Sequence, residues 1–328
     1  MKTIFAVLFL LSSFVQAQDS LRVSIGRVGS PNDTLTKTQP GFVLAGGGKD
    51  VDAAMKWLLE RSGGGDVVII RASGSTGYND YLFELGKVNS VETLLIDSRE
   101  KAARPETAEK IRNAEALFIA GGDQWNYVKY WKDTEVSKAI SYLIEEKKAP
   151  VGGTSAGCAV LSEFIFDAQF DTVLSPDALA NPYTQAVSIS KSFISIPVLK
   201  NTIADQHYSQ RKRQGRHVTF MARIMQDFKI DNPKGIAADE RTAVCIDAEG
   251  DAFVFGSGKA FFLTANKKPE QCSPDKPLTW NQKGMAVAVW SYQATEQGTR
   301  AFNLNRWPTQ PQEYWSAREG NLVQAENH

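Results

Sequence analysis

Short apolar runs alternate with stretches of helical periodicity through the first half of the chain. The apolar runs lie at residues 42–45, 66–72, 92–97 and 116–122. After the first run, Val51, Met55 and Leu58 recur at the spacing of one face of a helix. Strands that are buried on both faces consist of such uninterrupted apolar runs. The alternation therefore predicts βαβ units and a parallel sheet covered by helices.

The pattern changes in the second half of the chain. Residues 187–196 alternate between apolar and polar as a strand does. Residues 242–247 and 251–256 flank a short Ala-Glu-Gly turn, which predicts a hairpin. Two further apolar runs, at 259–266 and 285–292, are candidate strands.

These patterns predict an α/β protein with three layers, in which helices cover both faces of a mostly parallel sheet. We expect one domain over residues 41–265 and an irregular segment over residues 18–40 before it. Residues 266–328 form a C-terminal extension, which we expect to pack on or near the domain. The end of this extension is rich in Asn, Gln, Pro and Trp, and its pattern does not predict its role.

The first 17 residues have the pattern of a secretory signal peptide. Lys2 supplies the charged start, residues 4–11 are apolar, and residues 15–17 resemble an A-x-A cleavage site. The apolar run is shorter than the roughly 20 residues that a membrane span needs, and no later stretch is apolar for long enough. We therefore expect cleavage near Ala17 and an exported protein, periplasmic or extracellular, without a membrane span.

Charge and cysteine content exclude several classes of function. The chain has 37 basic and 37 acidic residues, and loss of Lys2 with the signal peptide leaves 36 against 37. This balance argues against nucleic acid as a partner. The three cysteines, Cys158, Cys245 and Cys272, are too few for a disulfide framework, and no Cys/His cluster has the spacing of a zinc site. We expect no metal and no cofactor.

The first candidate for chemistry is Ser155, in the Gly-Thr-Ser-Ala-Gly run of residues 153–157. The run follows a short apolar strand and precedes a helical stretch, and a serine on such an elbow projects from a tight turn. The amide of Ala156 is then a natural donor to an oxyanion, and Gly122, at the end of another strand, is a second. The alternative is that these small residues only form a turn that begins a helix.

A serine nucleophile needs a base, and histidine is the usual one. The chain has three histidines, of which His328 is the last residue. The other two lie in one polar segment. His207 follows an apolar strand, whereas His217 leads into an amphipathic helix, where a helix-cap role would suffice. We therefore favour His207 as the base.

Spacing alone does not choose the acid that would orient this histidine. Asp167 and Asp171 follow the elbow helix, and Asp239 and Glu240 precede a later strand. Glu240 would give the chain order Ser, His, Glu, whereas ordinary α/β-hydrolases place the acid before the histidine.

Three arginines, Arg211, Arg213 and Arg216, follow His207 closely. A run of this kind is often only a solvated basic face. In its functional interpretation it is a carboxylate site, because the guanidinium group offers a bidentate fork to a carboxylate.

Four separated motifs, taken together and in this order, resemble those of the cyanophycinases of peptidase family S51. The motifs are Gly121-Gly122-Asp123-Gln124, Gly153-Thr154-Ser155-Ala156-Gly157, Asp205-Gln206-His207 with Arg211, Arg213 and Arg216, and the run from Gly235 to Ala243. The resemblance covers about residues 40–260. The arginine-rich third motif points to the cyanophycinases rather than to the related aspartyl dipeptidases.

The resemblance implies a class I glutamine amidotransferase-like, flavodoxin-like fold and a triad of Ser155, His207 and Glu240. It also implies a substrate site, which would be lined by Gln124, Asp205, Gln206, Arg211, Arg213 and Arg216. The substrate of the family is cyanophycin, a polyaspartate with arginine on each side-chain carboxyl, which is cut to β-Asp-Arg dipeptides. The expected partner is thus an Asp- and Arg-containing polymer, and a homodimer is compatible with this interpretation.

Two positions depart from the family pattern. Cys158 stands where alanine is usual, and Ala237-Ala238 stands where Gly-Ile is usual, although the acid that follows is retained. One alternative function is an S51 exopeptidase or isoaspartyl dipeptidase that acts on other Asp-containing peptides. Another is a non-catalytic protein that binds acidic peptides in the arginine-lined pocket.

Overall fold

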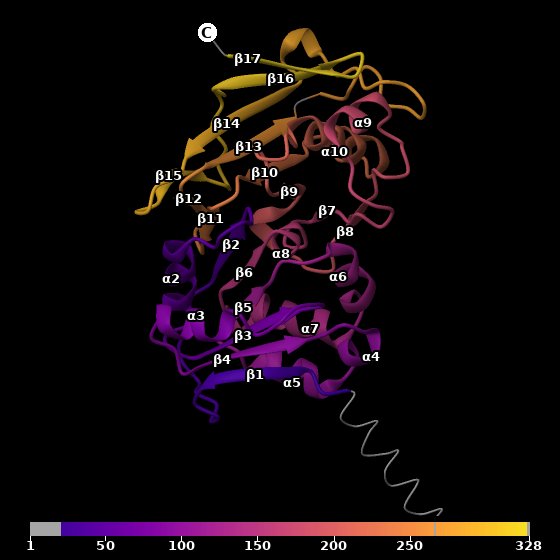
Figure 1. Cartoon of the computed structure of the whole chain (residues 1–328). Helices are drawn as coiled ribbons and strands as arrows, with labels where there is room; N and C mark the ends of the chain where they lie inside the picture. Colours follow the sequence, from indigo (N-terminus) through magenta and orange to yellow (C-terminus); the bar gives the residue numbers. More distant parts are fainter. Residues whose placement is uncertain (1–20, 266, 327–328) are drawn as a thin grey trace, which may run out of the picture.

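A computed structural model describes residues 21–265 and 267–326 of the chain (Figure 1). The expected signal peptide, residues 1–17, lies outside the described residues. The described strands form two sheets, one of nine strands and one of eight. In Figure 1 the N-terminal strands of the nine-stranded sheet occupy the lower part of the molecule, and its later strands reach up beside the eight-stranded sheet, which occupies most of the upper part.

The nine-stranded sheet has a parallel centre and antiparallel edges. Its order is β1-β4-β3-β5-β6-β2-β11-β12-β15. The neighbours from β4 to β2 run parallel, and the pairings at both edges are antiparallel. The strands are β1 Ser24–Gly29, β2 Gly41–Ala45, β3 Asp66–Arg71, β4 Ser90–Leu95, β5 Ala116–Ile119, β6 Val151–Thr154, β11 Thr242–Asp247, β12 Asp251–Gly256 and β15 Thr299–Asn303.

Helices cover both faces of the parallel strands, which gives the three layers that the sequence predicts. On β3, Val67 and Ile69 pack with α2 and α3, whereas Val68 and Ile70 point to the opposite face and share a core with α5 and α7. The helices on this sheet are α2 Asp52–Arg61, α3 Tyr78–Leu85, α4 Arg99–Ala102, α5 Pro105–Asn113, α6 Gln124–Trp131, α7 Glu135–Tyr142 with η1 Leu143–Lys147, and α8 Ala156–Ala159. Pro105 begins α5, as expected for a residue that cannot lie inside a helix.

The eight-stranded sheet has the order β17-β16-β14-β13-β10-β9-β7-β8. One face packs on α9 and α10, and the other shares a core with the nine-stranded sheet. Its strands are β7 Phe164–Phe166, β8 Ile189–Lys191, β9 Thr202–Asp205, β10 Lys234–Ala238, β13 Lys259–Ala265, β14 Val287–Gln293, β16 Glu313–Arg318 and β17 Asn321–Glu326. The remaining helices are α9 Ser175–Ala180, α10 Gln214–Asp227, η2 Pro197–Leu199 and η3 Gln282–Gly284.

The α/β class is confirmed, but three finer predictions need correction. The strands form two mixed sheets rather than one mostly parallel sheet. The segment 18–40, expected to be irregular, contains β1, which pairs antiparallel with β4. Of the strand expected over residues 187–196, only Ile189–Lys191 pairs, because β8 meets just the three residues of β7.

The C-terminal residues are built into both sheets rather than laid on the domain. β14, β16 and β17 extend the eight-stranded sheet beyond β13, and β15 forms an edge of the nine-stranded sheet. Through the described ranges, no helix combines the length and apolar character that crossing a membrane requires. Cys158 and Cys245 are buried and free, and Cys272 is half-buried and free.

Candidate active site

Ser155 lies on a sharp turn between β6 and α8. Its φ of 53° and ψ of −117° are outside the usual regions for a side chain of its kind. The flanking glycines are sterically required, because a methyl group on Gly153 would lie 2.4 Å from the Gly157 carbonyl oxygen. A methyl group on Gly157 would lie 2.1 Å from the carbonyl oxygen of Ile119. The Gly-x-Ser-x-Gly run therefore forms a strained elbow, as the nucleophile interpretation predicts.

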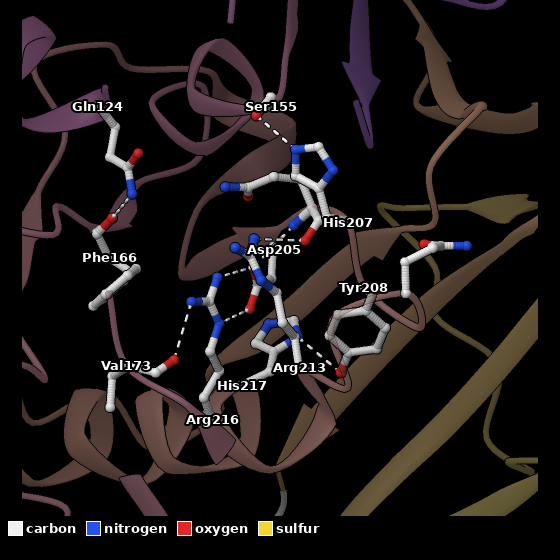
Figure 2. A network of polar contacts seen from close by, with 12 residues as sticks. Gln124, Ser155, Phe166, Val173, Asp205, His207, Tyr208, Arg213, Arg216 and His217 are labelled. Carbon is white, nitrogen blue, oxygen red and sulfur yellow. Dashed lines mark hydrogen bonds and ion pairs between the residues drawn. The ribbon is translucent and has the colours of Figure 1, made fainter. Parts of the chain in front are cut away.

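A continuous hydrogen-bonded chain links Ser155, His207 and Glu240. Ser155 Oγ lies 2.8 Å from His207 Nε2, and His207 Nδ1 lies 2.7 Å from Glu240 Oε1. Figure 2 shows the imidazole of His207 turned toward Ser155. Because a carboxylate only accepts, Nδ1 carries the proton and Nε2 is left to accept from the serine hydroxyl. This is the arrangement of a nucleophile, a base and an orienting acid.

The three residues come from two sheets. Ser155 follows β6 of the nine-stranded sheet, whereas His207 follows β9 and Glu240 follows β10 of the other sheet. A backbone hydrogen bond links the two sheets at this point, because the His207 amide, after β9, donates to the Gly46 carbonyl, after β2, at 2.8 Å. Within the nine-stranded sheet, the Ser155 amide donates to the Ala45 carbonyl at 3.0 Å.

The glycine run after β2 packs against His207 and Glu240. The site where a methyl group on Gly47 would stand is 2.4 Å from Cε1 of the His207 ring. A methyl group on Gly48 would be 3.1 Å from Cβ of Glu240. Both glycines also have positive φ, of 93° and 75°. The run therefore makes room for the imidazole and its carboxylate partner.

Gly47→Ala is expected to lower kcat/KM by at least about tenfold, because the new methyl group must displace the His207 ring. Gly284→Ala is the matched control, since Gly284 has a φ of 87° but no atom within 4 Å of the added methyl group. Both variants introduce a similar backbone strain, so a loss of activity in the Gly47 variant alone would be due to the clash of its methyl group with the His207 ring. Equal activities of the two variants would contradict this explanation.

Burial lowers the pKa of His207, and the charges of Arg211 and Arg213 act in the same direction. The hydrogen bond to Glu240 opposes this shift only in part. A base must be neutral to accept a proton, so a lowered pKa extends the neutral form to lower pH. The imidazole is therefore ready to act as a base at neutral pH.

The acid limb of kcat/KM is expected below pH 6.5, the ordinary pKa of histidine, with activity rising as pH rises through the His207 pKa. Arg211→Ala removes a nearby positive charge and should move this midpoint upward. Lys212→Ala, which changes an exposed neighbour, is the control and should leave the midpoint in place. A pH–rate series for the three proteins checks this order, and a downward shift in the Arg211 variant would refute it.

The two expected oxyanion donors lie close to the serine. A methyl group on Gly121 would be 3.4 Å from Ser155 Cβ, which places the 121–122 loop against the elbow. Within the described residues, the Gly122 amide donates to no protein acceptor. Ala156 is the first residue of α8, so its amide has no partner inside the helix. Both amides are thus free to bind an anionic oxygen.

The other candidates for base and acid have different surroundings. His217 is buried within α10, with Nδ1 3.1 Å from the Tyr208 hydroxyl and Nε2 3.2 Å from the Ile203 carbonyl oxygen. Burial lowers the pKa of His217 to about 4. Asp239 accepts hydrogen bonds from the Ser209 and Lys259 amides.

Asp167 and Asp171 also bind neighbours rather than His207. Asp167 Oδ1 accepts from the Ser188 hydroxyl at 2.5 Å and from the Gln169 amide at 3.2 Å. Asp171 accepts from the Thr172 amide at 2.6 Å. Of the four acids that the sequence left open, Glu240 is the one hydrogen-bonded to His207.

Three of the expected substrate-binding residues form a buried ion-pair cluster. Asp205 receives Nε of Arg216 at 2.9 Å and Nη2 at 2.6 Å, and Arg213 Nη1 lies 3.3 Å from the same carboxylate (Figure 2). Asp205 and Arg216 are each 2% exposed. Burial tends to raise the pKa of Asp205, but the charge of Arg216 holds it below its usual range. Because these three side chains are already paired with one another, we expect them to stabilise the segment that carries His207 rather than to contact the substrate directly.

The other three expected substrate residues have groups that remain available. Arg211 is exposed, and its side chain has no recorded partner in the described chain. Gln206 is 5% exposed, and its Oε1 has no hydrogen-bond partner among the described residues. Gln124 is half-buried, and its Nε2 donates to the Phe166 carbonyl at 3.3 Å. The role of all six residues in substrate binding stays a prediction.

Two pockets adjoin the residues that follow Gly48, and the sequence did not predict either of them. One, of about 570 Å³, is bordered by Arg241 and Glu296. The other, of about 390 Å³, is bordered by Arg71 and Tyr78. The only sign of these pockets in the sequence is the position of their residues at the carboxyl ends of parallel strands, where ligands bind in open α/β sheets. The segment that follows Gly48 lies after β2, and Arg71 is the last residue of β3. Within residues 21–265 and 267–326 there is no group of three or more His, Cys, Asp or Glu side chains suited to a metal ion.

Comparison with known proteins agrees with the geometry of a serine peptidase. Residues 43–253, more than half of the chain, match peptidase family S51, and the chain belongs to this family. It is a serine peptidase of the S51 type.

Particular relatives are more distant. The chain is 27% identical over 245 residues to the cyanophycinase of Synechococcus elongatus, covering 69% of this chain and 70% of that protein. It is 25% identical over 202 residues to the cyanophycinase of Trichormus variabilis, covering 60% and 62%. The crystal structure of a peptidase from an acI-B1 actinobacterium aligns with a TM-score of 0.49 at 18% identity, covering 68% of this chain and 90% of that one.

Proposed function

We propose that the protein is an exported serine hydrolase that cleaves the aspartate backbone of a cyanophycin-like polymer to β-Asp-Arg dipeptides. The observation that carries the proposal is the hydrogen-bonded chain from Ser155 Oγ through His207 to Glu240. The elbow presents the serine, and two free amides adjoin it, so the parts needed for acyl transfer lie together.

The reaction proceeds in two acyl transfers. Ser155 Oγ attacks the scissile carbonyl carbon, and His207 Nε2 takes the hydroxyl proton. The amides of Gly122 and Ala156 bind the oxyanion. As the C–N bond breaks, His207 gives this proton to the leaving amine. Water then attacks the acyl-serine and loses a proton to His207, which returns it to Ser155 as the carboxylic acid product leaves. Glu240 keeps the imidazole oriented and stabilises its charged form.

Two lines of support concern the substrate. The curated relatives named above are cyanophycinases, and they align over most of their length with this chain. Arg211, which lies near His207, is exposed and has no ion-pair partner among the described residues, and it also suits a carboxylate-rich substrate. The five parallel strands and the elbow after β6 support the class I glutamine amidotransferase-like classification as part of this proposal.

Export is proposed from the N-terminal sequence. Lys2, the apolar residues 4–11 and the small residue Ala17 together have the composition of a cleaved leader. Mass analysis of the mature protein recovered from its producing cells tests this proposal, since cleavage after Ala17 would leave residues 18–328.

Purified cyanophycin incubated with the mature protein, with products identified by mass, tests the reaction. Release of β-Asp-Arg is expected. If folded protein leaves the polymer intact but hydrolyses Asp-X or isoaspartyl dipeptides, the exopeptidase alternative replaces this proposal. If it hydrolyses neither and an active-site serine probe does not label it, the non-catalytic alternative gains support.

A further inference from the structure

A pocket whose lining includes Gly48, which packs against Glu240, contains polar groups that the triad does not use. It has a volume of about 390 Å³ and lies where β2 and β3 end. The lining groups that matter here are Lys49, Asp50, Asp52, Arg71, Tyr78 and Tyr81. Acidic, basic and aromatic groups therefore line one pocket, a combination that matches a ligand with separate positive and negative ends.

The acidic part of the pocket lacks a cation. The Tyr78 hydroxyl donates to Asp50 Oδ2 at 2.8 Å, and the Tyr81 hydroxyl donates to Asp52 Oδ1 at 2.8 Å. In the described chain no Lys or Arg nitrogen lies within 4.0 Å of either carboxylate. Burial raises the pKa of Asp50, and the charge of Asp52 acts in the same direction. A bound cation would supply the missing partner, and the tyrosine rings offer faces on which a guanidinium can lie.

Asp50 connects this pocket to the reacting serine. The Thr154 hydroxyl is near enough to act on the Asp50 carboxyl and lower its pKa, against the larger effect of burial. Even so, Asp50 Oδ1 and Thr154 Oγ1 are both buried without a hydrogen bond of good geometry in the described residues. Thr154 is 5% exposed and directly precedes Ser155. Asp50, in the pocket lining, and Thr154, next to Ser155, thus connect the pocket to the nucleophile.

Arg71 supplies the positive part of the pocket in a fixed position. Its Nε donates to the Ser73 carbonyl and its Nη1 to the Ser75 carbonyl, and it has no carboxylate within 4.0 Å in the described chain. A methyl group on Gly74 would lie 2.1 Å from Arg71 Nη2, so the loop closes tightly around the guanidinium. The same loop adjoins the oxyanion side, because a methyl group on Gly122 would lie 3.6 Å from Ser73 Oγ.

We propose that this pocket binds the arginine side group of the substrate as an N-acylarginine zwitterion, with its guanidinium at Asp50 and Asp52 and its α-carboxylate at Arg71. The inference rests on the proposed function. In a β-Asp-Arg unit within the polymer, the aspartate side chain acylates the arginine α-amine and the aspartate α-groups form the backbone amides, so the guanidinium and the α-carboxylate of the arginine are the two charges that stay free. Lys49 adds a second positive charge for the carboxylate. A substrate with an unmodified aspartate side chain would instead place a carboxylate next to that of Asp50, with no cation between the two.

Calorimetric titration of the mature Ser155→Ala protein with three dipeptides tests the pocket. The ligands are β-Asp-Arg, β-Asp-citrulline, which has a neutral ureido group in place of the guanidinium, and β-Asp-agmatine, which lacks the α-carboxylate. We expect β-Asp-Arg to bind about tenfold or more tightly than either analogue. Adding Asp50→Asn should abolish the preference over citrulline and keep the preference over agmatine. Adding Arg71→Gln should do the reverse.

Asp80→Asn, on the same helix as Tyr78 but outside the pocket lining, is the control and should keep both preferences. If Arg71→Gln unfolds the loop, Arg71→Lys retains the charge, and it should keep the preference over agmatine in part. Unchanged preferences in the Asp50 and Arg71 variants would overturn the inference. Failure of the wild type to cleave cyanophycin would instead count against the proposed function, and the binding ratios would still decide the role of the pocket.

Discussion

Ser155→Ala is expected to lower hydrolysis by about 10⁴-fold or more while leaving the fold intact. The Ser155 hydroxyl, 2.8 Å from His207 Nε2, is placed to attack a carbonyl, and its loss removes covalent catalysis. Alanine retains the elbow backbone and adds no bulk. Rates of cyanophycin hydrolysis, with circular dichroism of the same samples, check both halves of this prediction.

The base gives an internal check on this result. His207→Ala should lower the rate comparably, and the double variant should lose little more, because residues that act as a unit are not additive. Ser209→Ala, in an exposed neighbour of His207, should leave the rate nearly unchanged. An active-site serine probe should label the wild type and the Ser209 variant only. Multiplicative losses in the double variant would show that Ser155 and His207 do not work together.

Asp205→Asn is expected to destabilise the protein by about 3–5 kcal/mol, because it leaves Arg213 and Arg216 buried without their shared carboxylate. This is a large share of the roughly 5–15 kcal/mol by which most proteins are stable. Urea unfolding at neutral pH measures the loss. In the wild type, the pKa of Asp205 is held low in the fold, so this stabilisation is present above the ordinary pKa of aspartate and is lost as pH falls through the lowered value.

Asp167→Asn is the matched control for this experiment. Asp167 is also buried, at 4% exposure, but among the described residues it accepts only from the Ser188 hydroxyl and the Gln169 amide, so its loss should cost about 1 kcal/mol. A similar loss in both variants would show that the ion-pair cluster has no special weight.

The parallel centre of the fold could be predicted from the sequence because its strands are buried on both faces. Residues 67–70 and 116–120 are uninterrupted apolar runs, with no polar residue that would disguise them. β7 was not predictable, since it has only three residues, and the alternation over residues 187–196 predicted a longer strand than the three residues of β8, because pairing decides where so short a strand begins and ends. β1 was hidden because it alternates exposed and half-buried residues, with glycines in place of apolar side chains.

The catalytic residues could be predicted from the sequence because each of them lies in a recognisable motif. Ser155, His207 and Glu240 lie together as the resemblance implied, although the spacing of the chain left four acids open. The arginines show the limit of the same reasoning. Sequence treats Arg211, Arg213 and Arg216 alike, but the start of α10 turns the last two inward to Asp205 and leaves the first in solvent.

Ser155 follows a strand of one sheet, whereas His207 and Glu240 follow strands of the other. The distance between Ser155 and His207 therefore depends on the relative position of the two sheets. A slide of one sheet by about 1 Å would carry Oγ beyond hydrogen-bonding reach of Nε2 while every helix and strand stayed whole. The family match ends at residue 253, whereas β13, β14, β16 and β17 complete the layer that carries the histidine. Truncation of the chain to the matched residues 43–253 would therefore remove the strands that keep His207 aligned with Ser155.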